Sequence, residues 1–480
     1  MAWGRAEGEL DVHGMIARAQ RSRALHVMPS RKLDSRDCLR LCAALAQAPG
    51  SLTQLDLSGH ALEEEGVGAI GALLATPGCC IERLGLGDAR FGAAGIEALT
   101  KALGGAQSGL LALDLEYRGL NDAAGGILGE MFSHSLSQLR ELNLARNPLG
   151  DSGMHSLIRT VDRGLSLLEA VDFSEMNLTQ QGLIMMSDAM LPSGMDIMPS
   201  LSLITVSRNA IGDEGIAALA RLVEARPAIM KVLKVSACNF SAHGAALLGH
   251  AIGKSAAQLQ LLDLEENPGI GDAGCVALAE GLMDHQSQSS VAQLKLSSCG
   301  CADCGAVALS KVAGIKDLSL QHSFVGITGV TALLGLRGLQ RLSLFNDSTL
   351  GKTMASLQES GSRGNNDRDA FRVALGGSVD LCELDLGACA ISDSNLFSAF
   401  RDVSYAPGLE CLELNGNPLE PTAFSQVHAN LKQCRPGLDV VWRPPQSSES
   451  QPCHQLAQGE QNTVEDQDES DDDDEPPSLD

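Results

Sequence analysis

The chain has 480 residues, a net charge of −25 at pH 7 and only 3% aromatic residues. So acidic a protein repels the phosphates of nucleic acids and of anionic membranes, which excludes both as its principal partners. The first twenty residues contain no continuous apolar segment, and no later stretch approaches the 18 or so apolar residues of a membrane span. We therefore expect a protein of the cytoplasm or nucleus whose 14 cysteines are reduced.

A short L-x-L motif recurs throughout the chain and sets its organisation. Its first residues are Leu55, Leu84, Leu113, Leu142, Val171, Ile204, Leu233, Leu262, Leu294, Leu318, Leu342, Leu384 and Leu412. The first four steps between them are 29 residues long, and the later steps are 33, 29, 29, 32, 24, 24, 42 and 28 residues. Repeats of this length are typical of solenoids, in which each unit buries its apolar face against its neighbours.

Each unit follows the same order, as residues 139–161 illustrate. Alternating apolar residues at the start of this unit predict a half-buried strand, and apolar residues at helical spacing toward its end predict a helix. We expect Asp151 to cap that helix. Glycine stands at one fixed position near the helix start in nine of the thirteen units. A side chain there would push the helix away from the strands.

One slot of each unit, five residues after the motif start, is expected to point inward within the turn. Asn or Cys fills this slot in seven of the thirteen units, where it can satisfy backbone groups of its own and the next repeat. Arg118 also stands in this slot. We expect a structural role for it; the alternatives are that it extends outward beside Tyr117 or that it is a functional residue.

The ends of the chain differ from its middle. Residues 1–50 hold an N-terminal segment and a degenerate capping repeat, residues 51–445 hold the regular repeats, and residues 438–442 form a final capping strand. The 42-residue unit carries an insertion near residues 355–375, for which we expect a loop. Residues 446–480 carry twelve acids and no Lys or Arg, a composition typical of a disordered acidic tail. Removing those twelve charges from −25 leaves −13, so the repeats are acidic by themselves.

This repeat pattern resembles the ribonuclease-inhibitor-like class of leucine-rich repeats, from roughly Leu25 to Trp442. The resemblance implies an α/β horseshoe solenoid of about 13–14 repeats, with a parallel sheet inside and helices outside. Strands stack about 4.8 Å apart whereas packed helices need roughly 8–10 Å, so such a stack curves toward its strands.

Strand residues that point away from the core would line the concave face. Eleven of them are acids: Asp56, Asp114, Glu116, Glu141, Asp172, Asp263, Glu265, Asp317, Glu383, Asp385 and Glu413. Four are bases: Arg83, Lys234, Lys295 and Arg341. This bias favours a protein partner with a basic surface that is attracted electrostatically. The alternative is a solvated polar face without a partner.

Three motifs that suggest metal or cofactor chemistry have structural explanations. The run of Cys299, Cys301 and Cys304 lacks a second close Cys or His pair for zinc, and its first two cysteines occupy regular turn positions. The string GVGAIG at residues 66–71 follows three glutamates, which would repel a phosphate, and GHAIGKS at residues 249–255 ends a predicted helix. We therefore expect no metal, no cofactor and no catalytic residue.

Two classes of function fit the sequence. The first is a non-enzymatic scaffold for protein–protein interaction that holds a basic partner in its concave face. The second is a GTPase activator, because Ran GTPase-activating proteins resemble this chain in having such a horseshoe followed by an acidic segment. The residues that match that family's R-N-x-L-x-x-x-G pattern, and would contact a small GTPase, are Arg146, Asn147, Arg208 and Asn209.

Two observations weaken the two alternatives to the scaffold function. Pro148 and Ala210 stand where the Ran GTPase-activating family has a second arginine, so that resemblance is incomplete. A third class, the sensor region of a NOD-like receptor, requires a nucleotide-binding module that we do not find in the sequence. The sequence therefore favours the scaffold.

Overall fold

The repeating unit of the fold is a short strand, a tight turn and a helix. The computed structural model describes residues 11–19, 21–48, 50–87, 90–161, 165–191, 196–255, 257–283, 290–359, 362–400 and 407–443. The predicted acidic tail, residues 446–480, lies outside the described residues. No helix in the described part of the chain combines the length and apolar character needed to cross a membrane.

Fifteen strands pair in chain order into one parallel sheet. They are β1 (Ala24–His26), β2 (Gln54–Asp56), β3 (Arg83–Gly85), β4 (Ala112–Asp114), β5 (Glu141–Asn143), β6 (Ala170–Asp172), β7 (Leu203–Thr205), β8 (Val232–Lys234), β9 (Gln258–Asp263), β10 (Ser290–Lys295), β11 (Asp317–Ser319), β12 (Arg341–Ser343), β13 (Glu383–Asp385), β14 (Cys411–Glu413) and β15 (Asp439–Val441).

Helices alternate with these strands along the chain. They are α1 (Val12–Ala19), the 3-10 turn η1 (Pro29–Arg31), α2 (Ser35–Ala46), α3 (Glu64–Leu74), α4 (Gly92–Leu103), α5 (Ala124–His134), α6 (Gly150–Thr160), α7 (Gln180–Met190), α8 (Gly212–Ala225), α9 (Ala242–Ser255), α10 (Gly271–Met283), α11 (Asp303–Leu309), α12 (Ile327–Leu334), α13 (Ser348–Glu359), α14 (Ser362–Gly377), α15 (Asp393–Phe400) and α16 (Pro421–Cys434).

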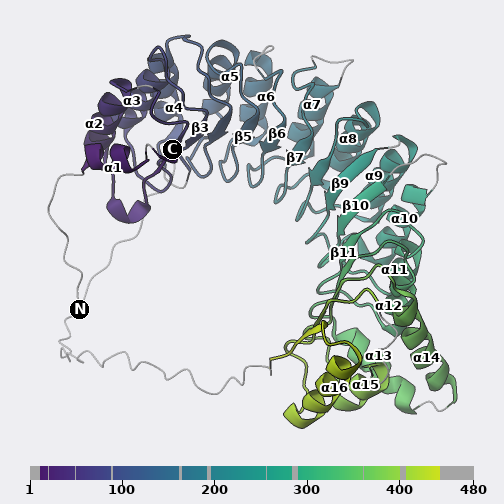
Figure 1. The fold of residues 1–480 in the computed structure, drawn as a ribbon. Helices are drawn as coiled ribbons and strands as arrows, with labels where there is room; N and C mark the ends of the chain where they lie inside the picture. The colour runs from purple at the N-terminus through teal and green to yellow at the C-terminus, as the bar shows by residue number, and fades with distance from the viewer. Residues whose placement is uncertain are drawn as a thin grey trace, which may run out of the picture. The chain divides into compact units, whose positions relative to one another are not determined.

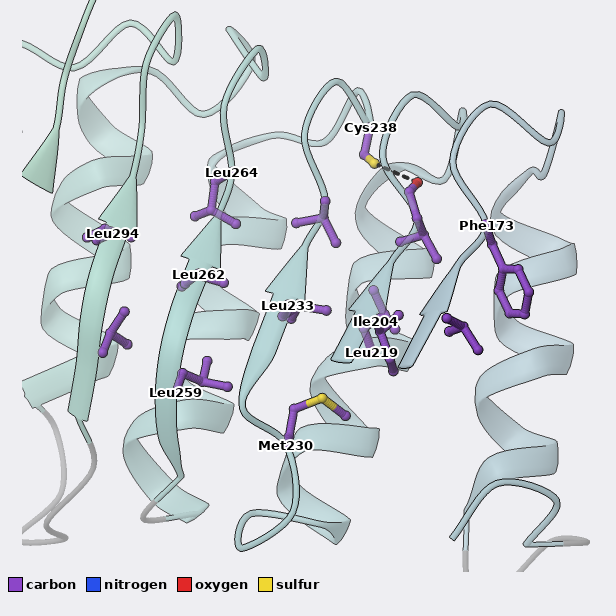
Figure 2. Close-up of a cluster of buried hydrophobic side chains, with 14 of the residues drawn as sticks. Phe173, Ile204, Leu219, Met230, Leu233, Cys238, Leu259, Leu262, Leu264 and Leu294 are labelled. Carbon is purple, nitrogen blue, oxygen red and sulfur yellow. Dashed lines mark hydrogen bonds between the residues drawn. The ribbon is translucent and has the colours of Figure 1, made fainter. Parts of the chain in front are cut away.

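The strands line the inner side of a curved stack and the helices cover its outer side (Figure 1). The predicted α/β leucine-rich-repeat horseshoe is therefore confirmed. The register aligns the motif residues across neighbouring strands, so that Leu113 pairs with Leu142 and Leu142 with Val171. Stacked middle residues such as Ile204, Leu233 and Leu262 point between the sheet and the helices, where they form a continuous apolar core (Figure 2).

The inward turn slot joins neighbouring repeats, as predicted. The Oδ1 atom of buried Asn147 accepts the backbone N–H groups of Arg118 at 2.8 Å and Leu120 at 3.1 Å in the preceding repeat. Its Nδ2 donates to the carbonyls of Leu115 at 2.8 Å and Leu144 at 2.9 Å. Equivalent bonds recur at the other buried asparagines of this slot, Asn209, Asn267 and Asn417.

In other repeats cysteine occupies this slot, and its shorter side chain makes fewer hydrogen bonds than that of asparagine. The Cys238 thiol donates to the Val206 carbonyl at 3.4 Å (Figure 2), and the Cys299 thiol donates to the Leu264 carbonyl at 3.0 Å. A thiol is a weak donor, but it satisfies one buried carbonyl in each repeat. Cys299 is therefore a turn residue, as its position in the repeat predicts.

The prediction that Asp151 caps the helix of its own repeat is wrong. Asp151 lies inside α6, and its Oδ1 accepts the backbone N–H of Thr179 at 2.9 Å, at the start of the next repeat's helix. Asp213 likewise accepts the N–H groups of Ser241 at 2.7 Å and Gly244 at 3.1 Å. Each aspartate thus caps its neighbour's helix, because the N–H groups there have no intrahelical acceptor. Asp272 and Asp303 make the same contacts two and three repeats after Asp213.

The recurring glycine makes room for this aspartate. A Cβ atom at Gly244 would lie 2.7 Å from Oδ1 of Asp213, and one at Gly305 would lie 2.7 Å from Oδ1 of Asp272. Such distances are far below ordinary van der Waals contact, so a side chain would displace the carboxylate. The expected reason, close packing of the helix on its own strand, therefore gives only part of the explanation.

The insertion in the 42-residue unit is helical rather than a loop. Residues 348–359 form α13, and residues 362–377 form α14, which packs against both α12 and α15. Phe371 and Leu375 of α14 are buried, and the Phe371 ring meets the Phe400 ring edge to face with centroids 6.3 Å apart. This buried apolar stripe makes a helix more stable than the predicted loop.

Candidate partner-binding face

The concave face is built by the first and third residues of each strand, which flank the buried middle residue. Five of the predicted acids are the third residues of their strands, namely Asp56, Asp114, Asp172, Asp385 and Glu413, and Asp263 is the last residue of the six-residue strand β9. Glu141, Asp317 and Glu383 are first residues, and Glu116 and Glu265 follow their strands by two residues. Of the eleven, only Asp263 is buried, with 7% of its surface exposed. The structure thus brings the predicted residues onto one face.

Two shallow hollows mark this face. The first has a volume of about 440 Å³ and lies over β2 to β8, with Arg83, Glu141 and Lys234 among its lining residues. The second has a volume of about 290 Å³ and extends from Lys295 of β10 to Glu383 of β13. Both are open to solvent and lined by charged and polar side chains, which suits a broad contact with a macromolecule better than enclosure of a small ligand.

Several of the predicted acids are neutralised by bases of this chain. Glu141 forms two hydrogen bonds with Arg83, of 3.1 and 2.5 Å, and Asp317 lies 2.6 Å from Arg341. Two further contacts of this kind join His26 to Asp56 at 3.1 Å and Arg146 to Glu116 at 3.5 Å. These four acids therefore contribute less negative potential than the sequence count implies.

The recurring aspartate at the third strand position also has a structural role. Oδ1 of Asp172 accepts the backbone N–H of Ser174 at 2.9 Å, and the Asn143 amide oxygen makes the same bond to Ala145. An uncharged asparagine suffices, so the position requires an acceptor rather than a charge. Burial of Asp56 would raise its pKa, but hydrogen bonds from Ser58 and the contact with His26 hold that pKa below its ordinary value.

Unpaired carboxylates gather at one end of the face, on β13 to β15. Glu383, Asp385, Glu413 and Asp439 lie on adjacent strands, and none of them forms an ion pair with any described residue. Burial raises the pKa of Glu413, and the negative charges of Asp385, Glu383 and Asp439 raise it further. Mutual repulsion of this kind marks an area that a cation would stabilise. We refer to these four residues as the acidic patch.

Asp439 is a member that sequence reasoning missed. The sequence predicts residues 438–442 only as a capping strand, but Asp439 is paired in register with Cys411 of β14. Its position before the buried Val440 repeats the position of Glu383 before Leu384. The same alternation that identified the other strands was therefore sufficient to find it.

The four residues that match the pattern of the Ran GTPase-activating proteins fall into two groups, the asparagines and the arginines. Asn147 and Asn209 are buried, and their side-chain amides are bonded to the backbone, so they present no surface to a partner. Arg146 and Arg208 are about half exposed and share Glu175, whose carboxylate lies 3.8 Å from one and 3.7 Å from the other. Only the two arginines remain available for such a contact.

Arg118 has a structural position. Its side chain is fully buried, Nη2 donates to the Gly87 carbonyl at 2.8 Å, and the guanidinium carbon lies 4.9 Å from the centre of the Phe91 ring. It also donates to the His60 carbonyl, two repeats away, at 3.4 Å. The expectation that it could extend outward beside Tyr117 is wrong.

The other motifs with possible chemistry lie in regular structure. Residues 66–71 lie within α3 and residues 249–255 within α9, so neither turns from a strand around a phosphate. Cys301 is buried, whereas Cys304 is exposed and its pKa is raised by the nearby Asp272 carboxylate, which disfavours the thiolate. The described part of the chain contains no group of three or more His, Cys, Asp or Glu residues that could hold a metal ion.

Comparison with known proteins agrees with this architecture. A family model for the leucine-rich repeat matches residues 51–71, 136–157, 199–220 and 258–279. The ribonuclease inhibitor of Mus musculus is 27% identical over 417 residues, which are 82% of this chain and 82% of that protein. The ribonuclease inhibitor of Sus scrofa is 31% identical over 280 residues, 57% of this chain and 58% of that protein.

A second kind of relative shares only the repeats. The NACHT, LRR and PYD domains-containing protein 5 of Homo sapiens is 25% identical over 291 residues, which are 60% of this chain. The chain spans 21% of that protein's length and less than two thirds of the Sus scrofa inhibitor's. The repeating strand, turn and helix, the parallel sheet and the family model together show that this chain is a leucine-rich-repeat protein, and it is similar to two ribonuclease inhibitors.

Proposed function

We propose that this protein is a non-enzymatic scaffold that binds a partner protein with a basic surface through its concave face. The proposal is supported first by the architecture, because a wide preformed concave surface is what leucine-rich-repeat solenoids offer to other macromolecules. The relatives support it as well, since the two ribonuclease inhibitors are by name proteins that act on another protein. The 12 described cysteines are free thiols, which suits the expected cytoplasmic or nuclear location.

The observation that carries the proposal is the acidic patch. Its four carboxylates form no ion pair with a described residue, although Glu383 lies beside Arg341 on the neighbouring strand. Elsewhere on the face, Glu141, Asp317 and Asp56 are in contact with Arg83, Arg341 and His26. A basic side chain of a partner would relieve the repulsion that raises the pKa of Glu413. The patch is therefore where a basic partner gains most.

The aromatic side chain of Phe345 lies beside the repeat that carries Glu383 and Asp385, where it adds apolar contact area. The Phe345 ring lies over Gly387, where a Cβ atom would be 2.8 Å from it, and 37% of Phe345 is exposed. Exposed aromatic residues next to charged ones are typical of the side chains that dominate binding energy at protein interfaces. The partner surface should therefore carry apolar residues next to its basic ones.

The test is a matched pair of charge-reversal variants. Glu383→Lys with Glu413→Lys reverses two patch charges, whereas Glu130→Lys with Glu280→Lys makes the same change in net charge on the exposed outer helices α5 and α10. Each immobilised protein would be exposed to a cell extract and to purified ribonuclease, at about 0.05 M and about 0.3 M salt. Bound proteins would be quantified by mass spectrometry.

We expect a set of basic proteins to bind the wild type and the outer-face variant at low salt, and to be lost from the patch variant. Reversal of two charges in a contact of this kind should weaken binding at least about tenfold, since each close charge pair contributes about 1 kcal/mol or more. Equal capture by both variants, or binding that does not respond to salt, would contradict the proposal.

The second candidate function is activation of a small GTPase. It is favoured by one observation, the exposure of Arg146 and Arg208 on the same edge of the solenoid. The test mixes the chain with a GTP-loaded Ran-type GTPase and measures phosphate release. The scaffold proposal expects no acceleration. Acceleration by substoichiometric amounts of the chain, abolished in Arg146→Ala with Arg208→Ala, would replace it.

A further inference from the structure

The turns that follow the strands form a second row of exposed residues, which we call the turn edge. In most of the described turns one residue has a left-handed backbone, and in six repeats this residue is large or charged: Tyr117 (φ 54°), Arg146 (φ 61°), Glu175 (φ 53°), Arg208 (φ 58°), Glu266 (φ 58°) and His322 (φ 54°). Glycine adopts this conformation more easily than other residues. It occupies this position in the turns after β2 and β14, as Gly59 and Gly416. The bulky side chains are therefore not required by the turn itself.

Tyr117 is the centre of a cationic group on this edge. The guanidinium carbon of Arg90 lies 5.0 Å from the centre of the Tyr117 ring, and that of Arg146 lies 5.2 Å from it. Nη2 of Arg90 also donates to the Tyr117 hydroxyl at 3.2 Å. The aromatic ring thus holds two positive charges near one another, which they would otherwise avoid.

A hollow of about 240 Å³ lies among these side chains. Its lining consists of Arg90, Gly92, Tyr117, Gly119, Arg146 and Pro148, so it contains two cations and no carboxylate. Gly92 and Gly119 leave part of its floor as bare backbone, with no side chain to fill it.

The positive charge of this hollow is only partly neutralised. Arg146 has carboxylates of Glu116 at 3.5 Å and Glu175 at 3.8 Å, both longer than the 3.1 Å between Arg208 and Glu266. Arg90 forms no ion pair with any residue that the structure describes. Although the protein has a net charge of −25, two guanidinium groups surround this open hollow. Guanidinium groups in this arrangement favour the binding of an anion.

We propose that the hollow of Arg90, Tyr117 and Arg146 binds an oxyanion, a carboxylate or phosphoryl group on a side chain of the partner protein. This inference rests on the proposed function, because the same partner would place basic residues on the acidic patch. Guanidinium groups bind both kinds of oxyanion through paired N–H donors, and the Tyr117 hydroxyl adds a further polar contact. Contacts of opposite sign at β13–β15 and at the turn edge of β3–β5 would fix the orientation of a partner with a matching charge distribution.

The first experiment needs no partner, because the chain contains only two tyrosines. The full chain would be labelled with 3-fluorotyrosine and followed by fluorine NMR, with Tyr117→Phe used to assign the Tyr117 signal. Inorganic phosphate and acetate would be titrated separately against chloride at equal ionic strength. We expect a saturable shift of the Tyr117 signal with phosphate, acetate or both, and the stronger of the two identifies the phosphoryl or the carboxylate source.

The control is a pair of double variants with the same loss of charge. Arg90→Gln with Arg146→Gln should abolish the saturable shift, whereas Arg159→Gln with Arg221→Gln, on the outer helices α6 and α8, should retain it. A shift that is absent, that chloride reproduces, or that persists in Arg90→Gln with Arg146→Gln would overturn the inference. Because no partner is present, this failure is distinct from failure of the scaffold proposal.

The second experiment uses a protein captured through the acidic patch. We expect Arg90→Gln with Arg146→Gln to raise the dissociation constant of that protein at least about fivefold, while the outer-face pair leaves it unchanged. An unchanged dissociation constant would show that the partner does not use the hollow, even where the patch is essential.

Discussion

The inward turn slot shows how the choice of one residue affects the stability of a repeat. Asn267 both donates to and accepts from the backbone of two repeats, and Cys238 only donates a weak bond. Asp347 occupies the same slot, is fully buried, and accepts the N–H groups of Val325 at 2.6 Å and Thr349 at 3.0 Å. A carboxylate cannot donate to the carbonyls that asparagine satisfies, so this slot is less well matched than its neighbours.

Burial raises the pKa of Asp347 from 3.8 to about 6, against the opposing effect of the hydrogen bonds from Val325 and Thr349. Because the folded-state pKa lies above the unfolded value, the folded protein binds this proton more tightly. The free energy of unfolding therefore falls as the pH rises from about 4 to about 6, and the loss persists above that range.

We predict that Asp347→Asn stabilises the protein at neutral pH. The amide removes the buried charge and can donate as Asn267 does, so the free energy of unfolding at about pH 7.5 should rise by about 1–3 kcal/mol. Urea denaturation at about pH 7.5 and about pH 4.5 would measure this, and the gain should be much smaller at the lower pH. The reverse change, Asn267→Asp, should destabilise the protein, and a gain for Asp347→Asn that is equal at both pH values would contradict the explanation.

At the scale of the elements, aspartate caps couple each helix to the next. The carboxylate of Asp213 in α8 accepts N–H groups at the start of α9, and glycine at position 244 leaves space for it. The coupling explains why the helices stack in a fixed register along the outer layer, although each is short. The acidic patch also belongs to this scale, because it arises only where β13, β14 and β15 lie side by side.

We predict that Asp213→Ala destabilises the protein by about 1–2 kcal/mol at neutral pH, the usual effect of losing a helix cap. Burial would raise the pKa of Asp213, but hydrogen bonds from Ser241 and Gly244 hold it below the ordinary value. Its contribution is therefore present above about pH 4 and is lost as the pH falls below that value. Chemical denaturation at about pH 7 and about pH 3 should show the variant and wild type converging in acid.

Asp188→Ala provides the comparison. Asp188 lies on α7 and pairs with Arg221 at 3.0 Å, with both side chains about half exposed. An exposed ion pair of this kind contributes less than about 1 kcal/mol, so this variant should lose clearly less stability than Asp213→Ala. Equal losses would show that the capping bonds do not stabilise the helix start.

At the scale of the whole molecule, the solenoid must cover the ends of its apolar core. The last unit does so with α16, whose Val427 and Leu431 are buried, and with Trp442, whose ring lies 4.9 Å from that of Phe424. Trp442 also donates from Nε1 to the Asn417 carbonyl at 3.4 Å, in the turn slot of the preceding repeat. The described residues all belong to one compact unit that ends at Pro444.

We predict that a chain ending at Pro445 unfolds at nearly the same temperature as the full chain, whereas a chain ending at Glu420 does not. The shorter chain loses α16, β15 and Trp442 and exposes the core residues around β14, so its Tm should fall by at least about 5 °C and it should aggregate. Scanning calorimetry with light scattering would measure both effects. If the chain ending at Glu420 kept the original Tm, the last unit would not act as a cap.

The repeat architecture could be predicted from the sequence because its determinants are local. The alternation around Leu142, the inward Asn147 and the helical spacing that follows occur in almost every unit, and a pattern repeated thirteen times leaves one fold class. The positions of the candidate residues on the strands also follow from the sequence, since side chains alternate along a strand and the first and third residues around each buried middle residue face away from the core. The role of those residues in binding remains a prediction.

Only the tertiary structure decided which charges are neutralised. Arg83 reaches Glu141 two strands away, across the small Ala112, and Arg208 reaches Glu266 across the repeat that carries Ala237. These pairs are separated by 58 residues, and their formation depends on stacking distance and on the size of the residue between them. The sequence by itself determined where each side chain points, because that follows from backbone period. Which side chains meet follows from packing between repeats, which no single repeat contains.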